Sequence, residues 1–462
     1  MNHRFEHSTT NQFHLVLQYA FSAMEIVDPR FYRNFCLRGV GKANFVISAK
    51  GEKDGMRIVW RLAKHRRSGF ISAKQKCQLL HEYIHRLIAP FIGEEFLVTP
   101  RIVRMHVSDL ITVAKIPSLP HNVKVDSFYE LDNANHYPPS LSLFPERCSR
   151  LVPTYPFIDL FEMPDVTRIP KRISNTFGPT ITIEIKPKQG FFQKHPEIEV
   201  PYCNNCILQI EKCHSAAFDQ MYDFCPLELY SGNYSRMFNA MSSLIDNPHR
   251  NLRIFLDGNP VHDAETVLTR PELEALISSN SSIQIDLLIK TLCHVLAGVQ
   301  DDTDDFYLRD HSILATLLRA QKIDPIGLVK AREIYESLPS NVKGELLNKN
   351  NLVKRANSGF LSATDPRSLL ERYLLAATLK DCSLMISFRV VTVEDSNGYS
   401  NLLKLRPTTD SNAQALFLNY AVRVVDCDFK SIHNLLNGYN RFITGVNVIR
   451  DSPCLLHKPC QI

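Results

Sequence analysis

The strongest constraint on the fold is the segment Thr180–Lys188 (TITIEIKPK), where an alternating strand pattern stops at charges and a proline. Three isoleucines fall on one face of an extended chain, and Glu184 and Lys186 fall on the other. Pro187 has no N–H for a neighbouring strand, so pairing is expected to stop there. The charged groups suit contacts with a ribose and with phosphate. A solvated strand edge protected by lysine and proline would show the same residue types.

The rest of the chain mixes strand and helix patterns without a repeat of 20–50 residues. A stretch of about 117–145 is rich in Pro, Ser and Asn and is expected to be a loop. Strands are predicted at 45–47, 56–62, 252–256, 382–391 and 421–425, and helices at 74–88, 235–245, 283–298, 310–336 and 366–379. This order predicts an α+β fold with two lobes.

The bulk composition restricts the class of protein. The chain has 462 residues and a formal net charge of +5, which argues against a nucleic-acid coat protein but permits one basic pocket for a polyanion. Twelve irregularly spaced cysteines are typical of reduced thiols in an intracellular protein. The N-terminus lacks a signal-peptide pattern, and the apolar stretch 283–295 is too short and too charged to span a bilayer. We expect a soluble protein of the cytoplasm or nucleus, without nucleic-acid or membrane partners.

Three further islands carry residue types that a hydrophobic core does not need. In 38–44 (RGVGKAN), Gly39 and Gly41 would let a backbone approach phosphate oxygens closely, although a plain β-turn has the same pattern. Asp381 precedes a buried strand, where a carboxylate can orient an attacking hydroxyl or can simply cap a turn. Asp426 and Asp428 stand two apart at a strand end, lie on one face if the strand continues, and suit Mg²⁺.

Cys203 and Cys206 form a Cys-x-x-Cys pair in a segment that also contains His195, Cys213, His214 and Cys225. A structural zinc site needs four thiolate or imidazole ligands, and the spacing supplies two of them. No second matching pair is present in the sequence. The pair is therefore compatible with a zinc site and with buried free thiols.

Taken together and in order, the islands resemble the inositol-pentakisphosphate 2-kinase family. The matching blocks are RGVGKAN, EIKPK followed by a Gly-Phe pair, CPLELYSGN, NLRIF, LKDCSLMI and VVDCDFK, and they extend from about residue 37 to 440. The family's corresponding segments are long and unusual. Their recurrence in the same order makes a chance match improbable.

The resemblance implies a kinase-like, bilobal α+β fold related to inositol phosphate and protein kinases, with lobes at 1–186 and 187–462. It implies an intracellular, monomeric enzyme that transfers the γ-phosphate of ATP to the 2-hydroxyl of inositol 1,3,4,5,6-pentakisphosphate. Asp381 falls where the family has its catalytic aspartate, and both Asp381 and Asp426 are expected to serve Mg²⁺. The remaining contacts follow from the same match. The residues expected at the nucleotide are Gly39, Gly41, Asn44, Arg61, Glu184 and Arg253. Those expected at the inositol phosphate are Arg147, with Arg150 as the alternative, Lys188, Lys212, Asn251 and Lys430.

The chain departs from the family pattern at several positions outside the two aspartates. Val40 stands where the family has Glu, Arg250 precedes Asn251 where the family has two Asn, and Ser431 replaces a Pro. These departures bear on substrate contacts. Two alternatives are therefore a related kinase with another inositol phosphate preference and a non-catalytic protein that binds a phosphate-rich ligand.

Overall fold

The structure is a computed structural model. It describes residues 25–40, 44–52, 56–63, 73–106, 109, 112–113, 157–169, 176–281, 283–300, 305–391, 401–406, 415–451 and 458–461. Gly41, Arg147 and the expected loop at 117–145 lie outside these ranges. The chain divides into two compact units, one within 1–81 and 99–165 and the other within 82–98 and 166–462.

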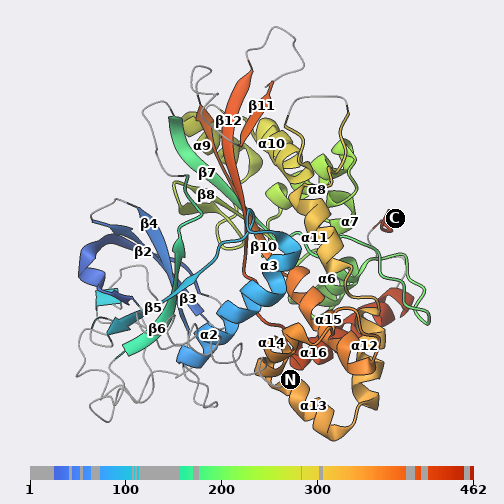
Figure 1. Ribbon diagram of the computed structural model, residues 1–462. Helices are drawn as coiled ribbons and strands as arrows, with labels where there is room; N and C mark the ends of the chain where they lie inside the picture. Colours follow the sequence, from blue (N-terminus) through green and yellow to red (C-terminus); the bar gives the residue numbers. More distant parts are fainter. Residues whose placement is uncertain are drawn as a thin grey trace, which may run out of the picture. The chain divides into compact units, whose positions relative to one another are not determined.

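The first unit is built on a six-stranded sheet with the order β1-β5-β6-β4-β3-β2. β1 pairs in parallel with β5, and the other neighbours are antiparallel. The strands are β1 Ile26–Val27, β2 Tyr32–Val40, β3 Asn44–Gly51, β4 Arg57–Ala63, β5 Arg101–His106 and β6 Phe157–Pro164, with a 3₁₀ turn η1 at Pro29–Phe31. Figure 1 shows β2, β3 and β4 side by side in blue.

Two carboxylates that are buried in the first unit have hydrogen-bond partners within that unit. Asp165 accepts hydrogen bonds from Ser48 and from Arg38, and Trp60 donates its indole N–H to Glu162 at 2.9 Å. Burying a carboxylate is costly unless it is paired. These contacts therefore explain how Asp165 and Glu162 can lie inside the first unit.

The second unit contains an antiparallel six-stranded sheet with the order β11-β12-β10-β7-β8-β9. β10 and β7 are its central strands, and every residue of β10 but one is buried. The strands are β7 Thr176–Ile185, β8 Leu252–Leu256, β9 Asn259–His262, β10 Ser383–Val391, β11 Leu402–Leu405 and β12 Leu416–Val425. Figure 1 shows β7, β10 and β12 as neighbours.

Helices make up the rest of the second unit. α2 Ala73–Tyr83 enters it and continues as a π-helical turn, η2 Ile84–Ile88. The others are α3 Ala89–Ile92, α6 Asn204–His214, α7 Pro226–Leu229, α8 Tyr234–Asp246, α9 Arg270–Ser281, α10 Ile285–Ala297, α11 Ile313–Gln321, α12 Gly327–Ser337, α13 Ser340–Leu347, α14 Lys349–Lys354, η6 Arg355–Asn357, α15 Pro366–Leu379 and α16 Ile432–Asp451. No helix among the described residues is long and apolar enough to cross a membrane.

A hydrophobic core of the second unit joins α6, α12, α15 and α16, with Ile207, Leu374 and Phe442 among its buried members. α6 and α16 cross closely at Gly445. A Cβ atom there would lie 2.5 Å from the carbonyl oxygen of Ile207. Glycine is therefore needed to let the two helices reach this separation.

The α+β fold class is confirmed, and most predicted elements are present within a few residues. The single helix expected at 310–336 is wrong, because α11 ends at Gln321 and α12 begins at Gly327. Pro325 lies in the break, where its ring and missing N–H are incompatible with a continuous helix. The expected lobe boundary at 186/187 falls inside the second unit, which begins again at residue 166. β7 belongs to this unit because it pairs with β8 and β10.

Candidate active site

Three strand ends meet at one end of the second sheet. β7 ends at Ile185, β12 ends at Val425, and β10 begins at Ser383 between them. Ile185 is in register with Leu384, and Val425 is in register with Ser383. The segments that begin with Lys186 and Asp426, and the one that contains Asp381, therefore lie together.

Asp381 accepts hydrogen bonds from two lysines that come from different segments. Lys188 Nζ lies 2.9 Å from Asp381 Oδ1, and Lys430 Nζ contacts Asp381 Oδ2. The Asp381 side chain remains 42% exposed, whereas the two lysines are 23% and 17% exposed. The carboxylate is thus fixed by cations and is still accessible.

Asp426 forms a second ion pair beside the first. Lys186 Nζ lies 3.0 Å from Asp426 Oδ2 and 3.4 Å from the carbonyl oxygen of Asp381. β12 ends at Val425, as predicted, and does not continue through Asp426, which has φ of 63° and turns the chain; the condition under which Asp426 and Asp428 would share one face of a strand is therefore not met. Lys188 has the same left-handed conformation, with φ of 62°. Such conformations are uncommon for residues other than glycine and often occur at functional sites.

The charges in this cluster alter one another's pKa values. Burial would raise the pKa of Asp381, but the ammonium groups of Lys188, Lys430 and Lys186 outweigh it and hold that pKa well below its usual range. Burial likewise opposes the charge of Lys186, whose pKa is nevertheless raised by Asp426 and Asp381. At neutral pH Asp381 is therefore an ionised carboxylate, and Lys186 is an ammonium group.

The segment after β12 is held against α15. Thr378 Oγ1 lies 2.9 Å from the hydroxyl oxygen of Tyr83 and donates to the carbonyl oxygen of Asp428 at 3.1 Å. The Tyr83 ring also packs on Phe429, with 4.0 Å between the centroids. These contacts fix the approach of Lys430 to Asp381.

Glu184 and Arg253 are paired across β7 and β8. They are directly opposite in register, and Arg253 donates to Glu184 Oε2 at 3.0 Å. Asn251 lies just before β8, where its carbonyl oxygen accepts from Lys186 N at 2.8 Å and its side-chain amide donates to Tyr222 Oη at 2.6 Å. The Asn251 carbonyl group therefore supports the backbone of Lys186, and Tyr222 holds the Asn251 side chain; contact of Asn251 with substrate stays a prediction.

Lys212 lies on α6 and contacts the face of the Phe218 ring, with its Nζ 4.4 Å from the ring centroid. Burial and the positive charges of Lys188, Arg441 and Arg250 lower its pKa to about 8. Three cations of the second unit thus repel the ammonium group of Lys212, and one of them, Arg441, is held by an ion pair with Glu211. An anion with several charges would relieve this mutual repulsion.

The expected nucleotide residues of the first unit lie on neighbouring strands. Gly39 on β2 and Arg61 on β4 are both in register with Val46 on the intervening strand β3, just after a register shift in β2. Asn44 begins β3 and is in register with Ala63. These three predicted residues therefore lie within one part of the sheet.

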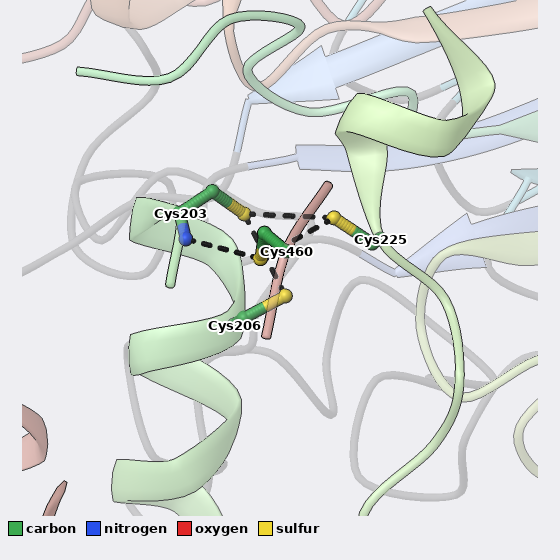
Figure 2. Close-up of side chains that lie close together, drawn as sticks. All are labelled: Cys203, Cys206, Cys225 and Cys460. Carbon is green, nitrogen blue, oxygen red and sulfur yellow. Dashed lines mark hydrogen bonds between the residues drawn. The ribbon is translucent and has the colours of Figure 1, made fainter. Parts of the chain in front are cut away.

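Four thiols gather at a separate place in the second unit (Figure 2). Cys203 caps α6, Cys206 lies in its first turn, Cys225 caps α7, and Cys460 comes from the C-terminal segment. All four sulfur atoms lie within 4.8 Å of one another. Cys213, His195 and His214 are not members of this cluster, which is the one candidate metal group among the described residues.

The spacing of the sulfur atoms fits a tetrahedral metal site. The separations are 3.6 Å for Cys203–Cys206, 3.9 Å for Cys203–Cys225 and 3.7 Å for Cys225–Cys460. A tetrahedron with zinc–sulfur bonds of about 2.3 Å has sulfur atoms roughly 3.8 Å apart, whereas a disulfide needs about 2 Å. Contacts from the other three thiols, first that from Cys203, hold the pKa of Cys460 well below its usual range. Among Cys203, Cys206 and Cys460, the last therefore supplies a thiolate most readily, because the pKa values of Cys203 and Cys206 are raised.

Two members of the cysteine cluster were not assigned from the sequence. Cys225 was noted only as a neighbour in the same segment, and Cys460 is separated from it by more than two hundred residues. Cys203 N also donates to Cys460 Sγ at 3.2 Å, and Cys460 N donates to the carbonyl oxygen of Pro201 at 2.9 Å. Only the folded chain reveals that the C-terminal segment returns to α6.

Lysines and aspartates that converge at the end of a sheet are typical of a protein that handles phosphate. Comparison with known sequences agrees with this class. The model of the inositol-pentakisphosphate 2-kinase family matches residues 38–441. The chain belongs to the inositol-pentakisphosphate 2-kinase family.

Individual relatives are distant. The inositol-pentakisphosphate 2-kinase of Arabidopsis thaliana is 24% identical over 279 residues, which cover 57% of this chain and 58% of that protein. The Danio rerio protein of the same name is 24% identical over 367 residues, or 63% of this chain and 71% of that protein. A Drosophila melanogaster relative is 29% identical over 146 residues, which are 25% of this chain and 23% of that protein.

Proposed function

We propose that this protein is an ATP-dependent kinase that transfers a phosphoryl group to the 2-hydroxyl of inositol 1,3,4,5,6-pentakisphosphate and produces the hexakisphosphate. The observation that carries the proposal is the cluster of Asp381 with Lys188 and Lys430 at the end of β10. Membership of the family and the names of its relatives support the same reaction.

In this proposal Asp381 positions the attacking hydroxyl. Its carboxylate is ionised and exposed, so it can accept a hydrogen bond from that hydroxyl. The low pKa of Asp381 makes its carboxylate a weak base as long as only the lysine ammonium groups contact it. When the ammonium groups also contact substrate phosphates, the negative charge of those phosphates offsets the effect of the ammonium groups on Asp381, so that its pKa rises and proton transfer becomes easier.

The proposed substrate site consists of Lys188, Lys430, Lys212 and Asn251, with Arg147 expected from the family resemblance. An ammonium has three donors, so Lys188 and Lys430 can each contact a phosphate while they retain Asp381. Lys212 has no acidic partner at salt-bridge distance among the described residues. A substrate with five phosphates would bring many negative charges to these groups, and its orientation would select the hydroxyl that reacts.

The proposed nucleotide residues fall in both units. Glu184 is proposed to accept from the nucleoside, and Arg253 to reach phosphate oxygens. In the first unit, Gly39, Asn44 and Arg61 are proposed to contact the phosphates, together with Gly41. Asp426, with Asp381, offers the one or two carboxylates that Mg²⁺ prefers when phosphates complete its shell. The ion would neutralise charge on the transferred group.

Zinc is proposed as a structural metal held by Cys203, Cys206, Cys225 and Cys460. The nearly tetrahedral spacing of four sulfur atoms supports this assignment. The metal would join α6, α7 and the C-terminal segment, and it has no proposed part in phosphoryl transfer. Metal analysis of the purified protein should find about one equivalent of zinc.

The decisive assay uses labelled ATP and inositol 1,3,4,5,6-pentakisphosphate, with the product position read by NMR. Mg²⁺-dependent formation of the hexakisphosphate supports the proposal. A panel of other inositol phosphates tests the alternative of a shifted substrate preference. A folded protein that binds the pentakisphosphate without transferring phosphate would contradict the proposed reaction and favour a binding protein.

The remaining properties are proposed from the resemblance and the composition. The protein is proposed to act as a monomer within the cytoplasm or nucleus, on a small-molecule substrate and without nucleic-acid or membrane partners. Gel filtration and imaging of the tagged protein in cells test these points.

A further inference from the structure

The side chain of Gln321 is completely buried at the C-terminal end of α11, and none of the roles above uses it. α11 is capped at its start by Ser312, whose hydroxyl oxygen accepts from Ala315 N. Pro325 follows its end and prevents the helix from continuing. The position of the Gln321 amide is thus set by a short helix with defined ends.

The Gln321 amide connects two loops of the candidate active site. Its Oε1 accepts from Gly190 N at 2.9 Å, and its Nε2 donates to the carbonyl oxygens of Lys188 at 2.8 Å and Leu379 at 3.2 Å. A longer contact of 3.4 Å joins Nε2 to the hydroxyl of Tyr230. Both ends of the amide are therefore satisfied by backbone groups from segments far apart in the sequence.

Each of these backbone groups needs a partner outside regular structure. β7 has already ended when the chain reaches Lys188, and Leu379 is the last residue of α15. Buried carbonyl groups at such positions are costly when they are unpaired. Gly190 adds a steric requirement, because a Cβ atom there would lie 2.5 Å from the Tyr230 ring. The loop can therefore pack here only as a close backbone approach.

The same two segments carry the side chains that meet in the candidate active site. Lys188 belongs to the first segment, and Asp381 follows Leu379 by two residues. Lys188 Nζ lies 2.9 Å from Asp381 Oδ1. Gln321 therefore sets the separation of the two backbones from which Lys188 and Asp381 extend.

A neighbouring ion pair braces the same region. Lys380 donates to Asp324 at 2.8 Å, and the Asp324 side chain is fully buried. Asp324 Oδ1 also accepts from the backbone N–H groups of Ile326 and Gly327. The turn after α11 therefore holds the residue next to Asp381, so displacement of Gln321 would not release the whole loop.

We propose that Gln321 is a positioning residue for phosphoryl transfer, which acts through the backbones of Lys188 and Leu379 to align Lys188 with Asp381. The inference rests on the proposed kinase function. A role limited to folding would lower stability alone. If Gln321 has a positioning role, its substitution lowers kcat in protein that is still folded, and the size of this decrease depends on the presence of Lys188.

The test compares Gln321→Met with a matched control, Gln209→Met. Gln209 is also buried and donates to one backbone carbonyl, that of Phe224, at 2.9 Å, and this hydrogen bond reaches neither loop. We expect Gln321→Met to lower kcat about tenfold or more and to change the KM for ATP less than twofold, because small misplacements of reacting groups cost that much. Gln209→Met should change kcat less than about twofold.

A double-mutant cycle with Lys188→Ala separates positioning from a general effect. The decrease in log kcat that Gln321→Met causes should be less than half as large in the Lys188→Ala background as in the wild-type background. The inference would be overturned if Gln321→Met lowered kcat by the same factor in both backgrounds. It would also be overturned if Gln321→Met lowered kcat no more than Gln209→Met does. Gln321→Glu keeps the acceptor for Gly190 and replaces the donor, so it provides the same test if the methionine variant does not fold.

Hydrogen exchange gives a measurement that does not depend on activity. In Gln321→Met, peptides that contain Gly190 and Leu379 should exchange faster, while core peptides of β10 remain protected. Unchanged exchange at Gly190 would overturn the inference. A wild-type protein that transfers no phosphate would refute the proposed function, and the exchange result would still decide whether Gln321 joins the two loops.

Discussion

The second unit contains two clusters of reactive side chains that differ in almost every physical respect. At the lysine–aspartate cluster, the Asp381 and Asp426 side chains are exposed by 42% and 47%, and Lys188 and Asp426 have a left-handed backbone. At the cysteine cluster, three of the four residues are buried, and two of them cap helices. The first cluster can exchange partners with a charged ligand, whereas the second is suited to hold one ion and join chain segments. A substitution in the lysine–aspartate cluster should therefore lower activity more than stability, and a substitution in the cysteine cluster should lower stability more than activity.

The largest expected effect separates activity from stability. Asp381→Asn should reduce kcat roughly a thousandfold, because the neutral amide cannot orient or accept from the hydroxyl as a carboxylate does. The free energy of unfolding should change by less than about 1 kcal/mol, because the ion pairs are partly exposed. Steady-state kinetics and chemical denaturation measure the two quantities. Asp286→Asn, which removes an exposed ion pair with Arg270, is the control. An active Asp381→Asn protein would contradict the role of Asp381.

The opposite result is expected at the cysteine cluster. Cys460→Ser should release zinc and lower the free energy of unfolding by about 4 kcal/mol, which is typical for loss of a structural metal. The residual folded protein should retain most of its kcat. Cys213→Ser, at the end of α6 and outside the cluster, should retain the metal. Metal analysis and thermal unfolding distinguish the variants, and a metal-free wild type would reject the zinc assignment.

A smaller effect tests the cations of the first cluster. Lys188→Met should raise the KM for the inositol phosphate about tenfold, since one charge-assisted contact contributes roughly 1.5 kcal/mol. Lys330→Met removes a lysine of α12 that pairs with Glu333 at the surface and should leave this KM nearly unchanged. A selective loss of ATP affinity in Lys188→Met would place Lys188 at the nucleotide instead.

The smallest predicted effect concerns pH. The pKa of Lys212 is lowered to about 8, so its ammonium form predominates below pH 8 and is lost above it. The KM for inositol pentakisphosphate should therefore rise as pH passes from 7.5 to 9. Lys212→Arg keeps its charge throughout this range and should flatten the curve. A wild-type profile identical to that of Lys212→Arg would exclude a contribution from Lys212.

Local patterns predicted the elements that position the site. Alternation at 180–186 identified β7 and its charged end, and the apolar run after Asp381 identified β10. The pairing of Lys186 with Asp426 depends on antiparallel register between distant strands, which no local pattern contains. Cys460 was not predicted because a single cysteine near the end of a chain has no spacing to interpret. Gln321 lacks a signal for the same reason, since its partners are backbone groups.

The left-handed backbone at Lys188 and Asp426 has a consequence for protein engineering. For most residues this conformation costs roughly 1 kcal/mol relative to glycine, so Lys188→Gly would relieve strain and remove a charged side chain at once. A library selected only for thermal tolerance should consequently enrich glycine or asparagine at both turns. Designers who seek a more durable version of this protein should hold these two positions constant and introduce their substitutions elsewhere.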